Sequence, residues 1–464
     1  MSGYRLGIKC CFCGGSLEID EASRTTRCSH CGSVLKIARE GTVRGYYVDD
    51  DTPKREVKFL IDRHLKKSGE SLVSRWGEMS KKYLPFWRIN AVVFSTYERM
   101  TGTSIEYDEF RLEPTEESSR TEVKIVPKEI SFCANDTFAW GIESLGIRTQ
   151  VLKLEPLDSE FYETNDPVPL TVDSEQATGR FDKAIQSTAS AVSQSGTNID
   201  VTGIMPETML IYFPVWVAEF TNRSGRHVAQ LDPLAKRVAS ITDGEIEIPR
   251  SSTPPSFKSD PVKIMPHRCP NCGCDLPQCE RSVTYYCANC KRLFMAEGMS
   301  YKQLRAKIPS DIEGEHQLFP FWVFDLSASF AGSDADEFDQ ALGLIGFSHE
   351  KFYVPAFNIV NPSRMLRLVS HYNKRNDTFA FEKHPTNDYT FADVTLTPEH
   401  AASMIVPLTV ATKTMKGFKS YEASVSGQAD VGDPDLVWLP YALDRYFWRE
   451  QITGAAIEKA AVKV

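Results

Sequence analysis

The chain has 464 residues, of which 42% are hydrophobic and 25% charged, a balance typical of a globular protein with two to four domains. Its formal net charge of −9 excludes an overall basic field that would draw the whole chain to nucleic acid. Its apolar runs, such as 209–217, are shorter than a membrane span, and the first residues lack a signal-peptide core. We therefore expect a cytoplasmic protein.

The first predicted element is a zinc ribbon over residues 1–40. Two Cys-x-x-Cys pairs, with 14 residues between them, supply Cys10, Cys13, Cys28 and Cys31. In a reducing compartment, closely spaced cysteine pairs bind metal more often than they form disulfides. Zn²⁺ accepts four thiolates in a tetrahedron, which leaves no position for water or substrate. We expect one structural zinc ion in this ribbon, with buried or disulfide-bonded cysteines as the alternative.

An α+β body is predicted over residues 41–248. Apolar residues at helical spacing predict one or two amphipathic helices over 53–83, broken near Gly69. From Leu84 to about residue 172, alternating β-branched and aromatic residues predict strands. A second helix is predicted through Phe181, Ile185, Ala189 and Val192, and strands resume near Met209.

A proline- and serine-rich linker is predicted over 249–266, a second zinc ribbon over 267–300 and a second α+β body over 301–464. The second ribbon repeats the 14-residue spacing with Cys269, Cys272, Cys287 and Cys290, so we expect a second structural zinc ion. The predicted fold class is α+β, with two four-cysteine ribbons, each followed by a β-rich body, as an internal duplication.

Proline-aromatic motifs support the duplication. Leu-Pro-Phe-Trp at 84–87 resembles Phe-Pro-Phe-Trp at 319–322, and Phe-Pro-Val-Trp at 213–216 resembles Leu-Pro-Tyr-Ala at 439–442. A further motif around Pro355 has only a loose counterpart around Pro156. Because proline cannot donate to a β ladder, we expect each one at a strand start or edge, with the aromatic side chains in the core. An exposed aromatic surface for peptide or single strands is the alternative.

The remaining cysteines and one histidine receive no ligand role. Cys11, Cys274 and Cys279 crowd the two sites as spare thiols, although Cys11 could exchange with Cys10. Cys133 is expected to pack in the core, and His30 to be a surface residue.

No catalytic motif for phosphate, zinc-hydrolase, serine-hydrolase or dinucleotide chemistry is present in the sequence. The acid-base candidates are dispersed through the second half, and such residues most often lie on the surface; they are His349, His371, His384, His400, Asp377, Asp388 and Asp393. We therefore expect a protein that is not an enzyme.

Both ribbons are locally basic, with formal charges of +2 over residues 2–40 and +3 over 265–305. The second also carries side chains of the kind that stack on bases or hold phosphates: Tyr285, Tyr286, Phe294, Lys291 and Arg292. It is therefore the candidate site for nucleic acid.

A ribbon with two Cys-x-x-Cys pairs, followed by Phe-Pro-Phe-Trp-Val-Phe-Asp at 319–325 and related strand openings, resembles bacterial TFIIB-type zinc-ribbon proteins. Some of these look like companions of membrane-stress scaffolds, namely phage-shock-type ESCRT-III relatives and SPFH (flotillin-like) proteins. The resemblance covers about a third of the chain. It implies an adaptor or scaffold for protein assembly, with a membrane-scaffold or coiled-coil protein as partner. Several relatives carry a transmembrane segment that this chain lacks, so membrane association is expected only through a partner. The alternative is a nucleic-acid-binding accessory protein.

Overall fold

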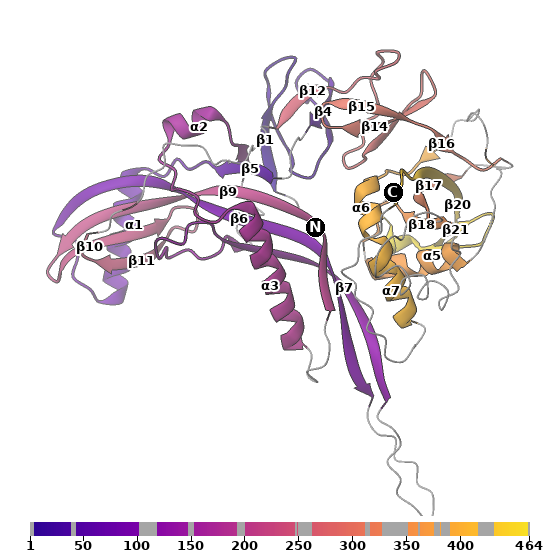
Figure 1. Cartoon of the computed structure of the whole chain (residues 1–464). Coiled ribbons are helices and arrows are strands. Elements are labelled where there is room, and N and C mark those ends of the chain that lie inside the picture. Colours follow the sequence, from indigo (N-terminus) through magenta and orange to yellow (C-terminus); the bar gives the residue numbers. More distant parts are fainter. Residues whose placement is uncertain are drawn as a thin grey trace, which may run out of the picture. The chain divides into compact units, whose positions relative to one another are not determined.

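The computed structural model describes residues 4–38, 43–101, 118–146, 153–192, 200–245, 248, 262–310, 316–326, 351–360, 362–374, 381, 390–415 and 431–462. The architecture is mixed α+β and mostly sheet (Figure 1). The chain divides into two compact units, each assembled from separate stretches of sequence. Unit 1 comprises Met1–Asn90, Glu129–Phe181 and Glu207–Pro266, and unit 2 comprises Ala91–Lys128, Asp182–Pro206 and His267–Val464.

Unit 1 is built on a large sheet with strand order β11-β10-β9-β5-β8-β1-β2, while β6 pairs with β9 and β7 with β6. Three long strands and a helix contribute to both units: β6 (Arg75–Thr101), β7 (Ser118–Cys133), β9 (Asp200–Asn222) and α3 (Ser174–Val192). The shorter strands are β1 (Arg5–Lys9), β2 (Ser16–Asp20), β5 (Val43–Val48), β8 (Lys153–Pro156), β10 (Gly225–Asp232) and β11 (Arg237–Asp243). The helices α1 (Lys54–Ser68) and α2 (Ser159–Thr164) also belong to unit 1. A separate small sheet has the strand order β12-β4-β3, with β12 at Lys263–Pro266, β4 at Val34–Ala38 and β3 at Thr25–Arg27.

Unit 2 contains a ribbon sheet of order β13-β14-β15 and a larger sheet of order β18-β17-β20-β21-β22, with β19 on β17 and β16 on β20. The ribbon strands are β13 (Thr284–Cys287), β14 (Arg292–Glu297) and β15 (Ser300–Leu304). The larger sheet comprises β16 (Ala306–Lys307), β17 (Gln317–Asp325), β18 (Lys351–Pro355), β19 (Thr390–Phe391), β20 (Asp435–Leu443), β21 (Phe447–Glu450) and β22 (Ala456–Glu458). The remaining elements are α5 (Pro362–Lys374), α6 (Pro398–Ser403), α7 (Ile405–Met415) and the 3₁₀ turn η2 (Lys459–Ala461).

The central strand β17 is buried on both faces, and its alternation assigns successive side chains to different cores. Leu318, Trp322 and Phe324 join a core that includes residues of α5, α6 and α7. Phe319 and Phe321 join the core on the other face, with Tyr441 of β20. The strong apolar run of β17 therefore reflects a strand covered on both sides.

The helix α1 confirms only the first part of the helical prediction for 53–83. It ends at Gly69, whose φ of 73° is left-handed, and it buries Val57, Leu60, Ile61 and Leu65 against β10 and β11. The prediction is wrong for the residues from Arg75 onward, which form β6. Trp76 packs against Phe220 of β9, with ring centroids 6.1 Å apart, so pairing with β9 determines the conformation of this segment. The second predicted helix is confirmed as α3.

The aromatic residues of the proline motifs are core residues, as predicted. Phe86, Trp87, Phe321, Trp322, Trp438 and Tyr441 are each at most 2% exposed. The two motif tryptophans also donate equivalent hydrogen bonds: Trp87 Nε1 to the Val172 carbonyl at 2.7 Å, and Trp322 Nε1 to that of Leu396 at 2.8 Å. The indoles of Trp87 and Trp322 are therefore both packed and hydrogen-bonded.

The prediction that these prolines start or edge a strand is wrong. Pro320 lies inside β17, between the residues that pair with β19 and those that pair with β18. Pro440 lies inside β20, between the stretches that pair with β16 and with β21. In β9, Pro214 likewise separates the residues that pair with β5 from those that pair with β10. Each proline, which has no N–H to donate, thus lies at the point where one side of a central strand stops pairing with one strand and starts pairing with another.

Two further expectations are corrected. Lys263–Pro266, at the end of the predicted linker, form β12 and pair with β4, whereas residues 249–261 lie outside the described residues. Pro156 ends β8, which pairs with β1 and β5, so it is no counterpart of Pro355 in β18. A contact similar to that beyond β18 occurs at the end of β7. The Ala134 and Ala356 N–H groups, just beyond β7 and β18, donate to the carbonyls of Pro85 and Pro320 at 2.8 and 3.0 Å.

Candidate metal centres

The first cysteine cluster is held by two tight turns. The Sγ atoms of Cys10, Cys13, Cys28 and Cys31 all lie within 4.8 Å of one another, with Cys10–Cys31 and Cys13–Cys28 each at 3.7 Å. The Gly14 N–H donates to the Cys10 carbonyl and the Gly32 N–H to the Cys28 carbonyl, both at 2.9 Å. Both glycines have φ above 70°, a conformation that glycine adopts without strain. This geometry is able to hold one metal ion.

The second cluster repeats this arrangement with Cys269, Cys272, Cys287 and Cys290. Cys269 and Cys290 Sγ lie 3.6 Å apart, and Cys272 and Cys287 Sγ 3.5 Å. Gly273 has φ 74°, but Lys291 takes the fourth glycine-like place with φ 55°, and its N–H donates to the Cys287 carbonyl at 2.8 Å. A lysine in the left-handed region carries strain on the order of 1 kcal/mol, so the turn is imposed by its surroundings.

Within each cluster the environment lowers the pKa of some thiols and raises that of others. The side chain and N–H of Ser33 lower the pKa of Cys31 to about 6, and the Asn289 side chain together with the backbone near Cys274 lowers that of Cys272 to about 6. Burial raises the pKa of Cys287 to about 12. A divalent ion changes this balance, because metal binding requires deprotonated thiols and releases protons.

The second cluster rests on a small aromatic core that includes an unpredicted histidine. His267 is fully buried, with Nδ1 2.7 Å from the Tyr301 hydroxyl and its ring edge-on to Tyr285 at 4.3 Å. Leu276, Tyr285 and Phe294 pack around the cysteines. His267 lies two residues before Cys269, and the sequence carries no spacing signal that distinguishes it from a surface histidine.

This core corrects the predicted stacking surface for nucleic acid. Tyr285 and Phe294 are 1% and 2% exposed, so neither ring offers a free face. Tyr286 is half-buried and packs on Phe391, with ring centroids 4.9 Å apart. Arg292 is exposed and donates to Asn271 Oδ1 at 2.8 Å. Aromatic residues predicted to be a binding surface are therefore structural.

The other cysteines lie outside the clusters. Cys10, and not Cys11, contributes the ligand atom, and Cys11 and Cys274 are exposed. Cys279 is half-buried beside Asp393, and burial raises its pKa to about 12. Cys133 is half-buried against the core of unit 1, and burial raises its pKa to about 11. His30 is exposed, with Nε2 3.2 Å from the Ser16 carbonyl.

The dispersed acid-base candidates form no common group among the described residues. His349, His384, Asp377 and Asp388 lie outside the described residues. His371 Nε2 lies 3.1 Å from the Thr453 hydroxyl, His400 belongs to α6, and Asp393 lies beside Cys279. Over the described ranges, the two cysteine clusters are the groups of three or more side chains able to hold a metal ion.

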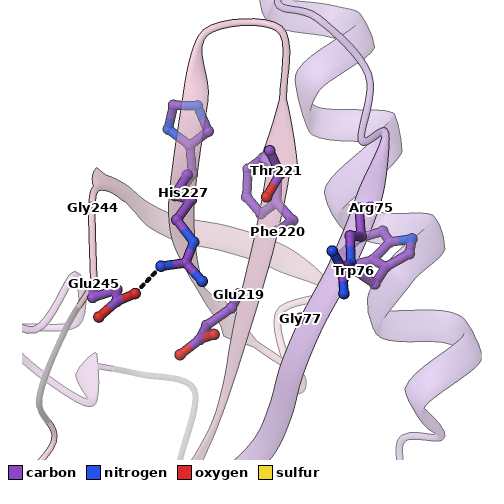
Figure 2. A pocket seen from close by; sticks show the side chains of 10 residues that line it. Arg75, Trp76, Gly77, Glu219, Phe220, Thr221, His227, Gly244 and Glu245 are labelled. Atoms are coloured by element: carbon purple, nitrogen blue, oxygen red, sulfur yellow. Dashed lines mark hydrogen bonds and ion pairs between the residues drawn. The ribbon is translucent and has the colours of Figure 1, made fainter.

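A pocket of about 190 Å³ lies in unit 1 where β6, β9 and β10 meet the residues after β11 (Figure 2). Gly77 of β6 and Glu219 of β9 are neighbours in its lining, since a Cβ on Gly77 would lie 2.9 Å from that of Glu219. Arg226 and Glu245 form an ion pair on its rim, with both side chains about two-thirds exposed. This solvated pair of opposite charges does not by itself select a ligand.

Beside this pocket, Ser224, His227 and Asp243 form a hydrogen-bonded series that sequence reasoning missed. His227 Nδ1 lies 2.8 Å from Asp243 Oδ1, and Nε2 lies 2.9 Å from Ser224 Oγ. Nucleophilic serine sites share this order. The Ser224 hydroxyl, however, also lies 2.6 Å from Asn222 Oδ1, which accepts the Ser224 N–H at 2.8 Å, and the Asp243 side chain is 92% exposed. These contacts close the β9–β10 turn rather than activate a nucleophile.

No family model matches the chain, and comparisons with curated proteins and with solved structures find no match either. Among the described residues, no helix is both long and apolar enough to cross a membrane.

Proposed function

We propose that this protein is a non-enzymatic, zinc-binding adaptor that assembles other proteins. The supporting observation is that four cysteines converge twice, with identical spacing and equivalent turns. Four thiolates complete a tetrahedral shell, so an ion at either site has no open position for substrate and acts in folding. A structural metal ion stabilises the fold of a small module, and such a module can then bind other proteins.

Zinc is the ion that we assign to both sites. Four thiolates in a tetrahedron suit zinc or an iron-sulfur centre, since soft ligands exclude magnesium and calcium. Zinc is favoured because each site has two Cys-x-x-Cys pairs separated by 14 residues, which is the ligand spacing of structural zinc ribbons.

We further propose that the two bodies arose by duplication. The strand orders β7-β6-β9-β10-β11 and β18-β17-β20-β21-β22 correspond. The third strand of each order also has a parallel partner, β5 on β9 and β16 on β20. The indole hydrogen bonds of Trp87 and Trp322 also correspond. A superposition of the β cores that left these strands unmatched would contradict the duplication.

For the partner, the resemblance favours a membrane-scaffold or coiled-coil protein. Nucleic acid is the second candidate, supported by the locally basic ribbons, but the burial of Tyr285 and Phe294 removes the stacking surface that favoured it. The two candidates differ in salt dependence, because a packed protein interface is screened less than phosphate contacts.

Affinity purification of the full chain from its native host, followed by mass spectrometry, tests the proposal. We expect a stoichiometric protein partner that stays bound at moderate salt. A Cys28→Ser or Cys287→Ser variant that loses zinc should lose that partner if the corresponding ribbon forms the interface. Recovery of DNA or RNA alone, with steeply salt-dependent binding, would instead support the nucleic-acid function.

A further inference from the structure

The helix α1 is a basic element in an acidic chain. It carries six cations, Lys54, Arg55, Lys58, Arg63, Lys66 and Lys67, against Glu56 and Asp62. The chain as a whole has a formal charge of −9, so this concentration of positive charge is local. Two of the cations, Lys66 and Lys67, occupy the last turn, where they also complement the helix dipole.

The outward face of α1 combines these cations with an exposed aromatic ring. Because the buried residues face β10 and β11, the helical repeat directs Arg55, Phe59, Arg63 and Lys66 away from the sheet. Phe59 is 61% exposed, and the Arg63 guanidinium lies 5.8 Å from the centre of its ring. A large apolar side chain among cations is not needed for packing within unit 1.

The acidic residues of α1 do little to neutralise this face. Glu56 Oε1 lies 2.5 Å from Lys236 Nζ, so its charge is already compensated. Asp62 is half-buried and accepts a hydrogen bond from the Val73 N–H, so it is engaged within unit 1. Arg63 donates to the Lys236 carbonyl at 3.2 Å, a neutral acceptor that leaves the guanidinium charge uncompensated, so its charge can act on an external anion.

Among the described residues of unit 2, no helix lies at the place that corresponds to α1. There, β16 ends at Lys307 and β17 begins at Gln317, whereas in unit 1 the whole of α1 lies between β5 and β6. The shared strand arrangement therefore forms without it, and its exposed face is not a requirement of the fold.

We propose that the outward face of α1, formed by Arg55, Phe59, Arg63 and Lys66, binds directly to the surface of an anionic lipid bilayer. The cations contact headgroup phosphates and Phe59 enters the boundary between headgroups and acyl chains. A convex helix face meets a flat bilayer without a matching groove, and the exposed Phe59 ring supplies the apolar group that inserts at a bilayer boundary. The contact is direct, in contrast to the partner-mediated association that the resemblance implies.

Cosedimentation of the zinc-loaded full chain with vesicles tests the proposal. We expect binding to vesicles of phosphatidylglycerol and phosphatidylcholine, little binding to phosphatidylcholine alone, and weaker binding at 300 mM than at 50 mM salt. Each cation is worth about a fivefold change in partitioning, so Arg63→Glu with Lys66→Glu should reduce binding at least about 30-fold. Phe59→Ala should reduce it about tenfold without loss of fold, since the ring is exposed.

The matched control is Lys302→Glu with Lys351→Glu, which makes the same change in net charge on exposed residues of unit 2 and should leave binding unchanged. Circular dichroism and zinc content verify that each variant is folded. The proposal is wrong if the α1 variants bind vesicles as the wild type does, or if neutral vesicles bind equally well. It is also wrong if α1 binds single- or double-stranded RNA in a charge-dependent way while vesicles fail to bind.

Discussion

Replacement of Cys287 by serine should remove one of two zinc ions and unfold one specific part of unit 2. Cys287 is 1% exposed and ends β13, so its thiolate is an inner ligand of the second cluster. Apparent zinc binding at such sites is worth about 10–16 kcal/mol, far more than the side chains around the cluster supply. The cysteines are packed by only a few buried groups, chiefly Leu276, Tyr285 and Phe294.

The damage should be local because β13 and β14 also face a second core. Val283, Leu293 and Met295 pack into the large core of unit 2, independently of the metal. Hydrogen exchange should therefore lose protection at the turns around Cys269 and Cys287, while the amides of β17 stay protected. Exchange is followed by mass spectrometry, and zinc by elemental analysis of protein purified without chelator.

Cys274→Ser is the control, since this exposed thiol lies two residues from Cys272 but outside the cluster. It should keep both zinc ions, whereas Cys287→Ser should keep one. Two ions retained in Cys287→Ser, or a zinc content near zero in the wild type, would refute the reasoning.

Three further outcomes are expected. Trp322→Phe removes the hydrogen bond to the Leu396 carbonyl and leaves that acceptor buried, so denaturant unfolding should show a loss of about 1–3 kcal/mol; an unchanged midpoint would contradict the role of the indole N–H. Lys291→Gly relieves the left-handed strain at φ 55° and should raise stability by up to about 1 kcal/mol, whereas Gly273→Ala should lower it by a similar amount, both measured by thermal unfolding. Burial raises the pKa of Cys133 from 9.0 to about 11, so the protonated thiol stabilises the fold fully below pH 9 and this contribution is lost as pH rises to 11. Cys133→Ala should therefore flatten the alkaline fall in stability between these values, and an unchanged fall would contradict the assignment.

The parts of the structure that the sequence predicted are those fixed by local chemistry. The convergence of Cys10 with Cys31 and of Cys269 with Cys290 follows from paired turns and a fixed spacing, and the left-handed glycines lie directly after the second cysteines. The helix α3 and the first part of α1 follow from periodic apolar residues. In each case, the information lies within a window of a few turns.

The errors concern residues whose conformation depends on distant neighbours. Trp76 lies in a strand because its segment pairs with β9. β9 is more than 100 residues away in the sequence, so the residues around Trp76 do not reveal this pairing. Tyr285 was a candidate for stacking on bases because it lies near other aromatic residues and near Lys291 and Arg292, whereas β13 has cores on both sides and the ring is buried. Pro320 is tolerated inside β17 because it lies between the residues that pair with β19 and those that pair with β18, where no N–H is required.

The pairing of β4 with β12 has a consequence for synthesis on the ribosome. The four cysteines of the first cluster lie between residues 10 and 31, so this cluster is complete long before β12 is synthesised. The sheet that carries Leu35 and Ile37, however, stays incomplete until Lys263–Pro266 are made. Until then, the edge of β4 exposes unpaired backbone groups beside apolar side chains. Such an edge can pair with the wrong strand or aggregate, and chaperones protect chains in this state. The nascent first ribbon is thus the segment for which we expect the longest dependence on protection before folding is complete.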